Sequence, residues 1–416
     1  MPDSLRRARL AVAAYFIVLG LADGVWLARI PAVKQHLGLS DGLLGVALLA
    51  GPVGLVFVAA FADRVIDRFG SAWPTMAGAV AISLLPIALG LSGSLAQLMV
   101  TLLVYGVSGG LMDVAMNSQA VRVEREYRRP LINSFHAYYS FGGLAGALLG
   151  GLFAWAGVGL ALTFTSVGVP LAVVAVLVRR GLLRGPEPRD AAVAGPDGTD
   201  SGMNQQNPAK SGLPGRETAG RPDAARRRRS AAVRIVALAL LALCSLLGEG
   251  AAGSWSAVYL HDNLGTSAAF AALGYAAFSL TMAFGRLAGD RLAARFGPGR
   301  LVSGCGVVAA VGLASALAVT SPVVGLIGFA LFGAGLSSTF PQMLSAAGNI
   351  ETSRSGTGIA RVAGGGYLGM LSGPVLIGGC ASLIGLRLAL GIPVVLSVFI
   401  AIGGRAAGGP RPRRRR

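Results

Sequence analysis

The stretch DRVIDRFG, residues Asp63–Gly70, returns 227 positions later as DRLAARFG, residues Asp290–Gly297. The first acid, both arginines, the phenylalanine and the glycine are shared between the two copies. Further landmarks keep the same offset: Leu37-Gly38 with Leu264-Gly265, Gly106 with Gly333, Met116 with Met343, Glu124 with Glu351, and Gly142 and Gly146 with Gly369 and Gly373. Several matches at one offset within apolar sequence indicate two copies of one membrane unit. A duplicated bundle of membrane helices is the usual architecture of a secondary transporter.

The composition also indicates a membrane protein. Apolar residues make up 54% of the 416 residues, charged residues only 13%, and the mean hydropathy is +0.66. This composition is too apolar for a soluble chain of this length. The cysteines Cys244, Cys305 and Cys380 lie in apolar runs without Cys-x-x-Cys spacing, which argues against a disulfide framework or a zinc site. Residues 1–20 resemble a signal peptide, but further apolar spans follow at once, so we expect them to begin the first helix.

The apolar segments predict the number of membrane spans. A helix that crosses about 30 Å of hydrocarbon needs about 20 mostly apolar residues. By that measure the spans fall near residues 10–30, 42–62, 73–92, 95–121, 131–154, 158–178, 234–258, 269–289, 301–320, 323–347, 357–384 and 386–403. We therefore expect an all-α membrane protein with twelve transmembrane helices in two pseudo-symmetric six-helix bundles. The expected units are a first bundle at 1–180, a disordered basic linker at 181–232, a second bundle at 233–404 and a basic tail at 405–416.

Basic residues predict the orientation of these spans. Twelve spans place both termini on one side, and of the 36 lysines and arginines only Arg29, Lys34 and Arg387 are assigned to the other side. Basic residues collect in cytoplasmic loops, so both termini are expected to be cytoplasmic in a multi-pass cell-membrane protein. The net charge of +18 suits attraction to anionic lipid headgroups, and on so apolar a chain we favour that reading over nucleic-acid binding.

The leading functional candidates are two acids, one inside the first span of each half. An ionisable group within a span costs about 2.5–3.5 kcal/mol on insertion scales and needs a reason to be there. Asp23 and its counterpart Glu249, one residue off the main register, both lie about 20 Å along their helices. Two acids at matched depth are expected to face each other across a central space and to exchange protons there. The alternative is that a hydroxyl or an arginine pairs with each acid, which then only fixes packing.

A second polar group is expected where the fourth and fifth spans meet. Asp113 and Asn117 are four residues apart and share one helical face, with Tyr105 on roughly the same stripe. In the next span His136 precedes Tyr139 by three residues, at a depth similar to that of Asp113. We therefore expect one cluster of Asp113, Asn117 and His136, in which the imidazole suits proton transfer. The alternative for His136 is a neutral ring that donates to a backbone carbonyl.

The remaining polar candidates are weaker. Trp26, one turn beyond Asp23, is a candidate wall of a sugar-sized site or an interfacial anchor. Gln342 follows a run of hydroxyl residues and Pro341, where a helix break would let it face a solute. His36 and His261 fall in the connections away from the termini, where no function is expected.

Catalysis and cofactor binding are not expected. The sequence offers no Ser/His/Asp or Cys/His pairing and no cluster of metal ligands. Glycines four apart, at Gly142, Gly146 and Gly150 and again at Gly365, Gly369 and Gly373, indicate close helix packing. A nucleotide-binding role for them is disfavoured because neither a strand nor a phosphate-binding lysine accompanies them.

Several motifs resemble those of a known family. The stretch Asp67–Gly70 after the second span, together with twelve spans in two halves, resembles the major facilitator superfamily. The chain is more closely similar to the MosC/YbjJ-like branch, which is related to the fucose–proton symporters. The matching stretches are Trp26–Pro31, Asp113–Asn117 and Ser134–Ala137, with Gly142-Gly143. The resemblance covers nearly the whole chain except the central linker and the tail.

This resemblance implies alternating access of two bundles around a central site that carries a small polar or sugar-like solute, with protons as the coupling ion. Acids on the first and fourth helices serve protonation and sugar binding in fucose-type symporters, and Asp23 and Asp113 stand on those helices. It also implies a cytoplasmic gate in the two loops that contain Asp63, Arg64, Asp67, Arg68, Asp290, Arg291 and Arg295. Asp63 stands where the general motif has glycine, and Ala294 replaces the acid of the second copy.

Two other functions remain open from the sequence. One is a proton-driven antiporter that exports amphipathic compounds, and the other is a membrane sensor that signals through its basic linker. The solute and the direction of transport are not determined by the sequence. We expect the chain to work as a monomer, without cofactor.

Overall fold

The structure is a computed structural model that describes residues 3–59, 61–127, 131–183, 221–348, 350 and 355–407. Within these ranges every regular element is a helix. The first half contains α1 (Asp3–His36), α2 (Asp41–Ala59), α3 (Ala62–Phe69), α4 (Ala72–Gly90), α5 (Leu95–Tyr127), α6 (Ile132–Trp155), α7 (Leu160–Val178) and η1 (Arg179–Gly181). The second contains α8 (Arg221–Val258), η3 (Tyr259–Asn263), α9 (Ala268–Phe296), α10 (Pro298–Ala318), α11 (Pro322–Leu336), α12 (Thr339–Gly348), α13 (Ser355–Ile384), α14 (Leu386–Ala389), α15 (Gly391–Gly403) and η4 (Gly404–Ala407).

Twelve of the described helical segments are long and apolar enough to cross a membrane. Helices suit this environment because all their backbone hydrogen bonds are made within the segment. Prolines inside spans, such as Pro52, Pro86 and Pro374, are accommodated without ending the helix. The predicted all-α fold with twelve spans is therefore confirmed.

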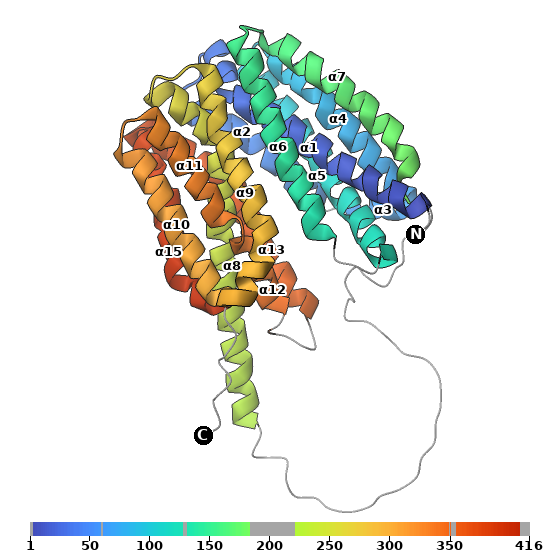
Figure 1. Cartoon of the computed structure of the whole chain (residues 1–416), viewed down its shortest axis with the longest axis vertical. Coiled ribbons are helices and arrows are strands. Elements are labelled where there is room, and N and C mark those ends of the chain that lie inside the picture. The colour runs from blue at the N-terminus through green and yellow to red at the C-terminus, as the bar shows by residue number, and fades with distance from the viewer. Residues whose placement is uncertain are drawn as a thin grey trace, which may run out of the picture.

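The helices pack as two bundles that meet at one end of the molecule. In the first, α1 packs against α4, α5, α6 and α7; in the second, α8 packs against α9, α11, α12, α13 and α15. Contacts between the bundles run mainly from α2 to α13 and from α6 to α9. Figure 1 shows the bundles converging away from the termini and diverging toward them. We call the end with the start of α1 the termini face and the other end the opposite face.

Glycines at the same repeat positions end corresponding segments. Gly38 and Gly265 have φ angles of 61° and 64°, and Gly70 and Gly297 have φ angles of 69° and 82°. Side chains rarely adopt this left-handed conformation, so glycine is the residue that lets the chain turn there. The repeated motif is thus a pair of turns that terminate helices at both faces.

Serines after the first of these turns begin the next helices. The Ser40 hydroxyl accepts the backbone N–H of Leu43 at 3.3 Å, and the Ser267 hydroxyl accepts that of Phe270 at 3.2 Å. Each bond satisfies a donor that the helix leaves unpaired in its first turn. The Leu-Gly-x-Ser repeat therefore encodes a turn followed by a helix cap.

Glycines inside the helices permit close contact at equivalent places in both bundles. A Cβ on Gly106 of α5 would overlap the carbonyl oxygen of Gly51 on α2, and one on Gly333 of α11 would overlap that of Phe278 on α9. Positions 51 and 278 are themselves related by the repeat offset. The duplication thus extends to the points where helix backbones touch.

The structure corrects two boundaries and supports a third. The segments expected to be gate loops are helical, because α3 ends at Phe69 and α9 runs through Arg291 to Phe296. Helix α8 begins at Arg221, inside the predicted linker, whose residues 184–220 lie outside the described residues, as do 408–416 of the tail. The helix break expected near Pro341 is present between Leu336 and Thr339.

Candidate functional site

Asp23 lies in the middle of α1, and two tyrosines hold its carboxylate. Tyr105 on α5 donates its hydroxyl to Oδ1 at 2.6 Å, and Tyr139 on α6 donates to Oδ2 at 3.0 Å. Helix α1 can lie this close to α6 because residue 20 is a glycine. A Cβ at that position would overlap the Tyr139 carbonyl oxygen. Among the described residues no basic side chain forms an ion pair with Asp23. Its charge is therefore stabilised by neutral hydroxyl groups alone.

The two acids of the repeat border the same part of the interface between the bundles. Tyr139 on α6 and Tyr275 on α9 each interact electrostatically with both Asp23 and Glu249. The Tyr275 hydroxyl also lies 3.5 Å from the position that a Cβ of Gly143 on α6 would occupy. Because α6 and α9 belong to different bundles, the two tyrosines lie where the halves meet.

Asp113 and Asn117 form a second polar pair on α5. The Asn117 amide donates to Asp113 Oδ1 at 3.0 Å and to the Asp113 backbone oxygen at 2.9 Å. Asp113 interacts electrostatically with Asp23 and with Tyr367 on α13 of the second bundle. The first bundle thus presents two carboxyl groups toward the second.

Glu249 is paired with an arginine that the sequence analysis did not single out. Nη2 of Arg286 on α9 lies 3.0 and 3.3 Å from the two Glu249 carboxylate oxygens, and Nη1 donates to the Ser140 hydroxyl on α6 at 3.1 Å. The two charged side chains are only 19% and 24% exposed. Arg286 on α9 therefore joins α8 of its own bundle to α6 of the first bundle.

The position of Arg286 along its helix explains why sequence analysis alone did not single it out. The predicted span ended at residue 289, which would put Arg286 beside the basic loop. Helix α9 instead continues to Phe296, so Arg286 lies about 15 Å inside the helix end. The available indication was a basic residue with apolar sequence on its N-terminal side and glycine beside it.

His136 contacts residues other than Asp113 and Asn117. Its ring packs edge-on against Phe16 of α1, with ring centroids 5.2 Å apart, and its charged neighbour is Arg286. The hydrogen bonds between described residues join Asn117 to Asp113 but not His136 to either. The expected three-residue cluster is thus divided between two neighbouring places.

Trp26 and Gln342 occupy different environments. Trp26 is 5% exposed and packs against Phe164 of α7, inside the first bundle, so it is neither a wall that a solute could reach in this conformation nor an interfacial anchor. Gln342 is half-buried on α12, one turn after the break that separates it from α11.

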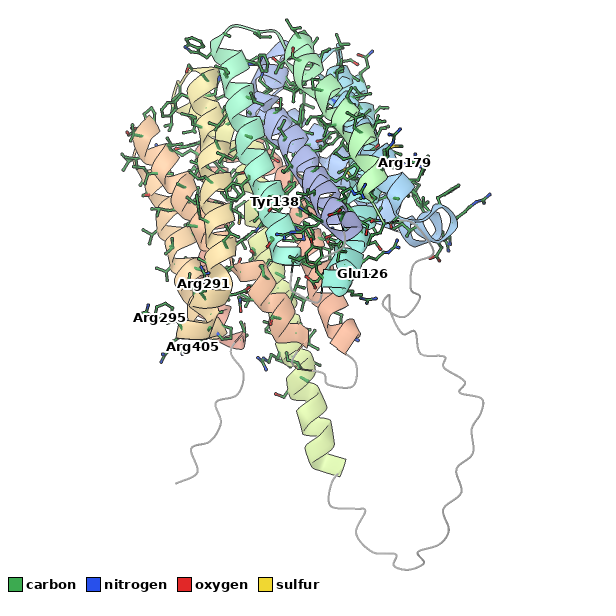
Figure 2. All side chains as sticks on the ribbon, turned by 45° about the vertical axis from the view of Figure 1, so that its right-hand side comes forward. Glu126, Tyr138, Arg179, Arg291, Arg295 and Arg405 are labelled. Atoms are coloured by element: carbon green, nitrogen blue, oxygen red, sulfur yellow. The ribbon has the colours of Figure 1, made fainter. Side chains whose placement is uncertain are left out.

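The expected gate residues lie at the termini face. On α3 these are Arg64, Asp67 and Arg68, and at the end of α9 they are Asp290, Arg291 and Arg295, all exposed; the Asp63 side chain is outside the description. Figure 2 shows Arg291 and Arg295 together with Arg405 at one end of the second bundle. Arg68 stacks on Phe69 at 5.5 Å and Arg295 on Phe296 at 5.4 Å, so the repeat keeps this contact too.

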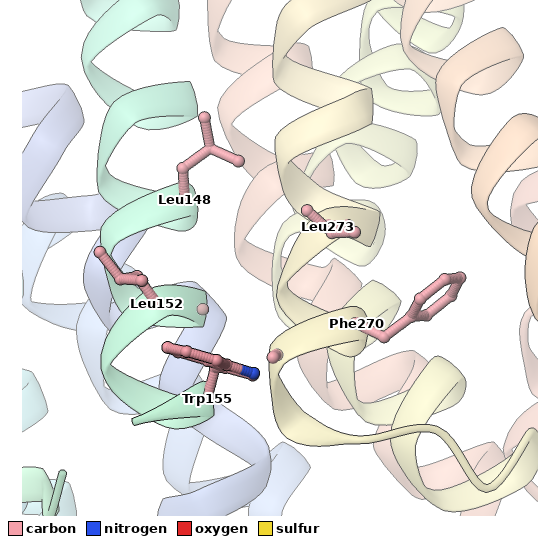
Figure 3. A pocket seen from close by; sticks show the side chains of 7 residues that line it. Leu148, Leu152, Trp155, Phe270 and Leu273 are labelled. Atoms are coloured by element: carbon pink, nitrogen blue, oxygen red, sulfur yellow. The ribbon is translucent and has the colours of Figure 1, made fainter. Parts of the chain in front are cut away.

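A recess of about 330 Å³ lies elsewhere, between α6 and α9 (Figure 3). It is lined by Leu148, Gly151, Leu152, Trp155, Ala269, Phe270 and Leu273. Apart from the Trp155 indole N–H, this lining offers no polar side chain to orient a solute. The recess therefore does not match the chemistry of the polar side chains around Asp23.

Within the described ranges no three His, Cys, Asp or Glu side chains come together as a group that could hold a metal ion. The chemistry available between the bundles is that of three carboxyl groups, one guanidinium, an imidazole and several hydroxyls.

Comparison with known proteins identifies the family. The profile of the Major Facilitator Superfamily matches residues 11–237 and again residues 238–416. The chain belongs to the Major Facilitator Superfamily. The two matches meet at residues 237 and 238, within α8 and near the start of the second bundle, in accordance with the sequence duplication. The chain is therefore a multi-pass membrane protein of a transporter superfamily and not an enzyme.

Relatives and solved structures of the superfamily match over nearly the whole chain. An uncharacterized transporter, y4wD of Sinorhizobium fredii, is 33% identical over 94% of this chain and 96% of its own length. An uncharacterized MFS-type transporter of Yersinia pestis is 31% identical over 94% and 93%, and membrane protein MosC of Rhizobium meliloti is 27% identical over 94% and 88%.

Among solved structures, a bacterial homologue of the human lysosomal transporter Spinster aligns with a TM-score of 0.72, 17% identity and coverage of 99% and 100%. A D-xylose–proton symporter aligns with a TM-score of 0.71, 13% identity and coverage of 95% and 96%. Similarity at these identities concerns the fold.

Proposed function

We propose that the protein is a proton-coupled secondary transporter of a small polar or sugar-like solute. The observation that carries this proposal is the Asp23 carboxylate at the bundle interface, whose hydrogen bonds from the described residues come from two tyrosine hydroxyl groups. A buried acid without a basic partner is stabilised more weakly as an anion than one in an ion pair, so it can take up a proton during transport. The similarity to a D-xylose–proton symporter supports a comparable use of the fold.

Protonation of Asp23 would rearrange its hydrogen bonds. As an anion the carboxylate only accepts, and it accepts from Tyr105 and Tyr139. A protonated oxygen becomes a donor, so one tyrosine hydroxyl must turn and offer its lone pair or bond elsewhere. The tyrosines stand on α5 and α6, and proton uptake therefore changes a contact between three helices of the first bundle.

The other polar side chains complete the proposed site. Asp113 with Asn117 supplies a second acid and an amide for solute hydroxyls, and Tyr139, His136 and Gln342 supply further polar contacts. Glu249 acts as a supporting acid whose charge is balanced by Arg286.

The proposed orientation has both termini in the cytoplasm. Exposed arginines of α3, α9 and the segment after α15 support this orientation, because cytoplasmic ends of spans are enriched in basic residues. With that orientation the bundles diverge toward the cytoplasm and meet at the outer side. The exposed gate residues on α3 and α9 would then close the cytoplasmic side during the cycle.

The experiment begins with the solute. Thermal unfolding of the purified protein with a panel of sugars and cyclitols, at pH 5.5 and 7.5, identifies a stabilising compound. Uptake of that compound into proteoliposomes is then measured with an imposed proton gradient. Asp23→Asn should abolish proton-driven accumulation and spare solute exchange, whereas Glu126→Gln, an exposed acid at the end of α5 (Figure 2), should change neither. Accumulation by Asp23→Asn at the parent rate would exclude Asp23 from coupling.

A further inference from the structure

A lysine at the end of α1 holds acids from both bundles at the opposite face. The Lys34 ammonium lies 2.5 Å from Asp41 Oδ1 on α2 and 2.5 Å from Asp262 Oδ2 on η3. The Lys34 and Asp262 side chains are 14% and 27% exposed, so water screens this pair less than a fully exposed one. The contact with Asp262 crosses from the first bundle to the second.

A second polar contact lies beside this ion pair. The Gln35 amide nitrogen is 3.4 Å from each ring nitrogen of His261, and His261 Nδ1 is 2.7 Å from Asp262 Oδ1. The repeat offset of 227 relates Lys34 to His261 and Gln35 to Asp262. The contacts Lys34–Asp262 and Gln35–His261 are therefore one contact made twice across the pseudo-two-fold axis.

The other contacts at this face are close backbone packing. On α2 and α13 a Cβ on Gly45 would lie 2.8 Å from the Gly378 Cα, and one on Gly42 would lie 3.1 Å from the Ser382 Cβ. Such packing fits the two surfaces together but places no charge between them. Among the described residues, the side chains Lys34, Gln35, His261 and Asp262 supply charged and polar contacts between the bundles at this face.

Asp41 gives this arrangement a way to open. When the bundles separate at the opposite face, Lys34 must leave Asp262 but stays with Asp41, because both belong to the first bundle. The ammonium is then never left without a counter-charge, which limits the cost of opening. Asp41 thus competes with Asp262 for one lysine.

We propose that Lys34, Gln35, His261 and Asp262 form a two-fold lock that holds the opposite face closed, and that Asp41 sets how readily it opens. This inference concerns the conformational cycle of the superfamily fold and is independent of the solute and of proton coupling. Lys34 acts here as a positioning residue that controls access to the central side chains.

The test measures access from the opposite face in the full-length chain. Cys244, Cys305 and Cys380 are replaced by serine, and Gly253→Cys is introduced as a reporter. Gly253 is buried on α8, one turn from Glu249 toward the opposite face, and a Cβ there would meet Leu27 at an ordinary 3.4 Å. The labelling rate by a membrane-impermeant maleimide is measured in sealed vesicles of both orientations, without solute or proton gradient.

In vesicles that expose the opposite face, Asp262→Asn and Lys34→Gln should each raise the labelling rate about fivefold, equal to about 1 kcal/mol at tenfold per ~1.4 kcal/mol. Lys34→Arg should keep the parent rate. Asp41→Asn should lower the rate, since it frees Lys34 for Asp262, whereas a general loss of packing would raise the rate in every variant. Arg387→Gln removes a charge at the same face and should have no effect, because Arg387 donates to the backbone oxygens of Leu317 and Ala318 in its own bundle.

Thermal unfolding of each variant serves as the folding control, and Asp262→Asn carries the test if Lys34→Gln does not fold. Unchanged labelling in Asp262→Asn would overturn the proposed lock, and unchanged or faster labelling in Asp41→Asn would overturn the proposed role of Asp41. Loss of proton-driven transport in other experiments would leave these rates unaffected, so the two proposals fail separately.

Discussion

Removing either partner of the Glu249–Arg286 pair should destabilise the protein, and removing both should cost little more than removing one. At the 3.0 Å separation of Arg286 Nη2 and Glu249 Oε1, two unit charges attract by about 5.5 kcal/mol at an effective dielectric constant of about 20, and by about 1.4 kcal/mol in bulk water. Side-chain exposures of 19% and 24% place the pair between these limits. Desolvation and side-chain ordering oppose the attraction, so we expect a coupling free energy of about 2 kcal/mol.

The assay is a double-mutant cycle of Arg286→Gln and Glu249→Gln, with thermal unfolding of the purified protein followed by intrinsic fluorescence. Each single change should lower the unfolding free energy by about 2–3 kcal/mol, because it leaves the partner buried without its counter-charge. In a chain of this size that corresponds to a fall in Tm of about 2–4 °C. The double variant should fall by about the same amount as either single variant.

Arg291→Gln on the same helix is the matched control. Its side chain is exposed at the termini face, so its removal should change the unfolding free energy by less than about 0.5 kcal/mol. If the two single effects instead add in the double variant to within about 0.5 kcal/mol, the pair contributes no coupling and the stabilising role of the Glu249–Arg286 pair is refuted.

Three further comparisons between variants test other parts of the structure by the same unfolding assay. Gly106→Ala and Gly333→Ala should each destabilise the protein by about 1–3 kcal/mol, because the added Cβ meets a backbone oxygen. The control Gly304→Ala adds a Cβ that meets nothing within 4 Å, so it should be neutral or stabilise by up to about 1 kcal/mol. Equal effects at all three positions would contradict the close packing. Tyr105→Phe should lower the unfolding free energy by about 1 kcal/mol, because it removes one hydrogen bond to Asp23. The double variant Tyr105→Phe/Asp23→Asn should lose less than the sum of the two single losses, and strict additivity would contradict the shared contact. Trp26→Ala should lower the unfolding free energy by about 3–5 kcal/mol, because it leaves a cavity in the core. Trp155 is 77% exposed, so Trp155→Ala should change the unfolding free energy by less than about 1 kcal/mol. The reverse order would place Trp26 at the surface.

The fold was predictable because it depends on properties that are local in the chain. Long apolar segments specify spans, and the glycines at 38, 70, 265 and 297 specify turns at fixed places in both copies. The predicted break in the tenth span followed from Ser337 to Pro341 in the same way. Helix boundaries were harder to predict where a helix continues into polar sequence, as α8 and α9 do. The backbone hydrogen bonds that extend these helices do not require apolar side chains.

The polar site was predictable only in part. Asp23, Asp113 and Glu249 stand out as acids in apolar sequence, and their spacing places Asn117 beside Asp113. Their partners are distant in the chain: Tyr105 and Tyr139 reach Asp23 from 82 and 116 residues away, and Arg286 reaches Ser140 from 146. Which tyrosine or arginine meets which acid depends on how helices rotate and pack, and periodicity within one helix does not contain that information.

The sequence by itself determined a duplicated bundle of twelve membrane helices, since hydrophobic length, turn glycines and the 227-residue offset act locally and need no knowledge of neighbours. Only the tertiary structure decided that Asp23 is bonded to hydroxyls while its counterpart Glu249 is bonded to an arginine, and that Lys34 joins the bundles at the opposite face. The physical reason is that a charge within a membrane protein is stabilised by whatever side chain lies within about 3 Å of it. Those neighbours come from helices that the chain brings together only when it folds.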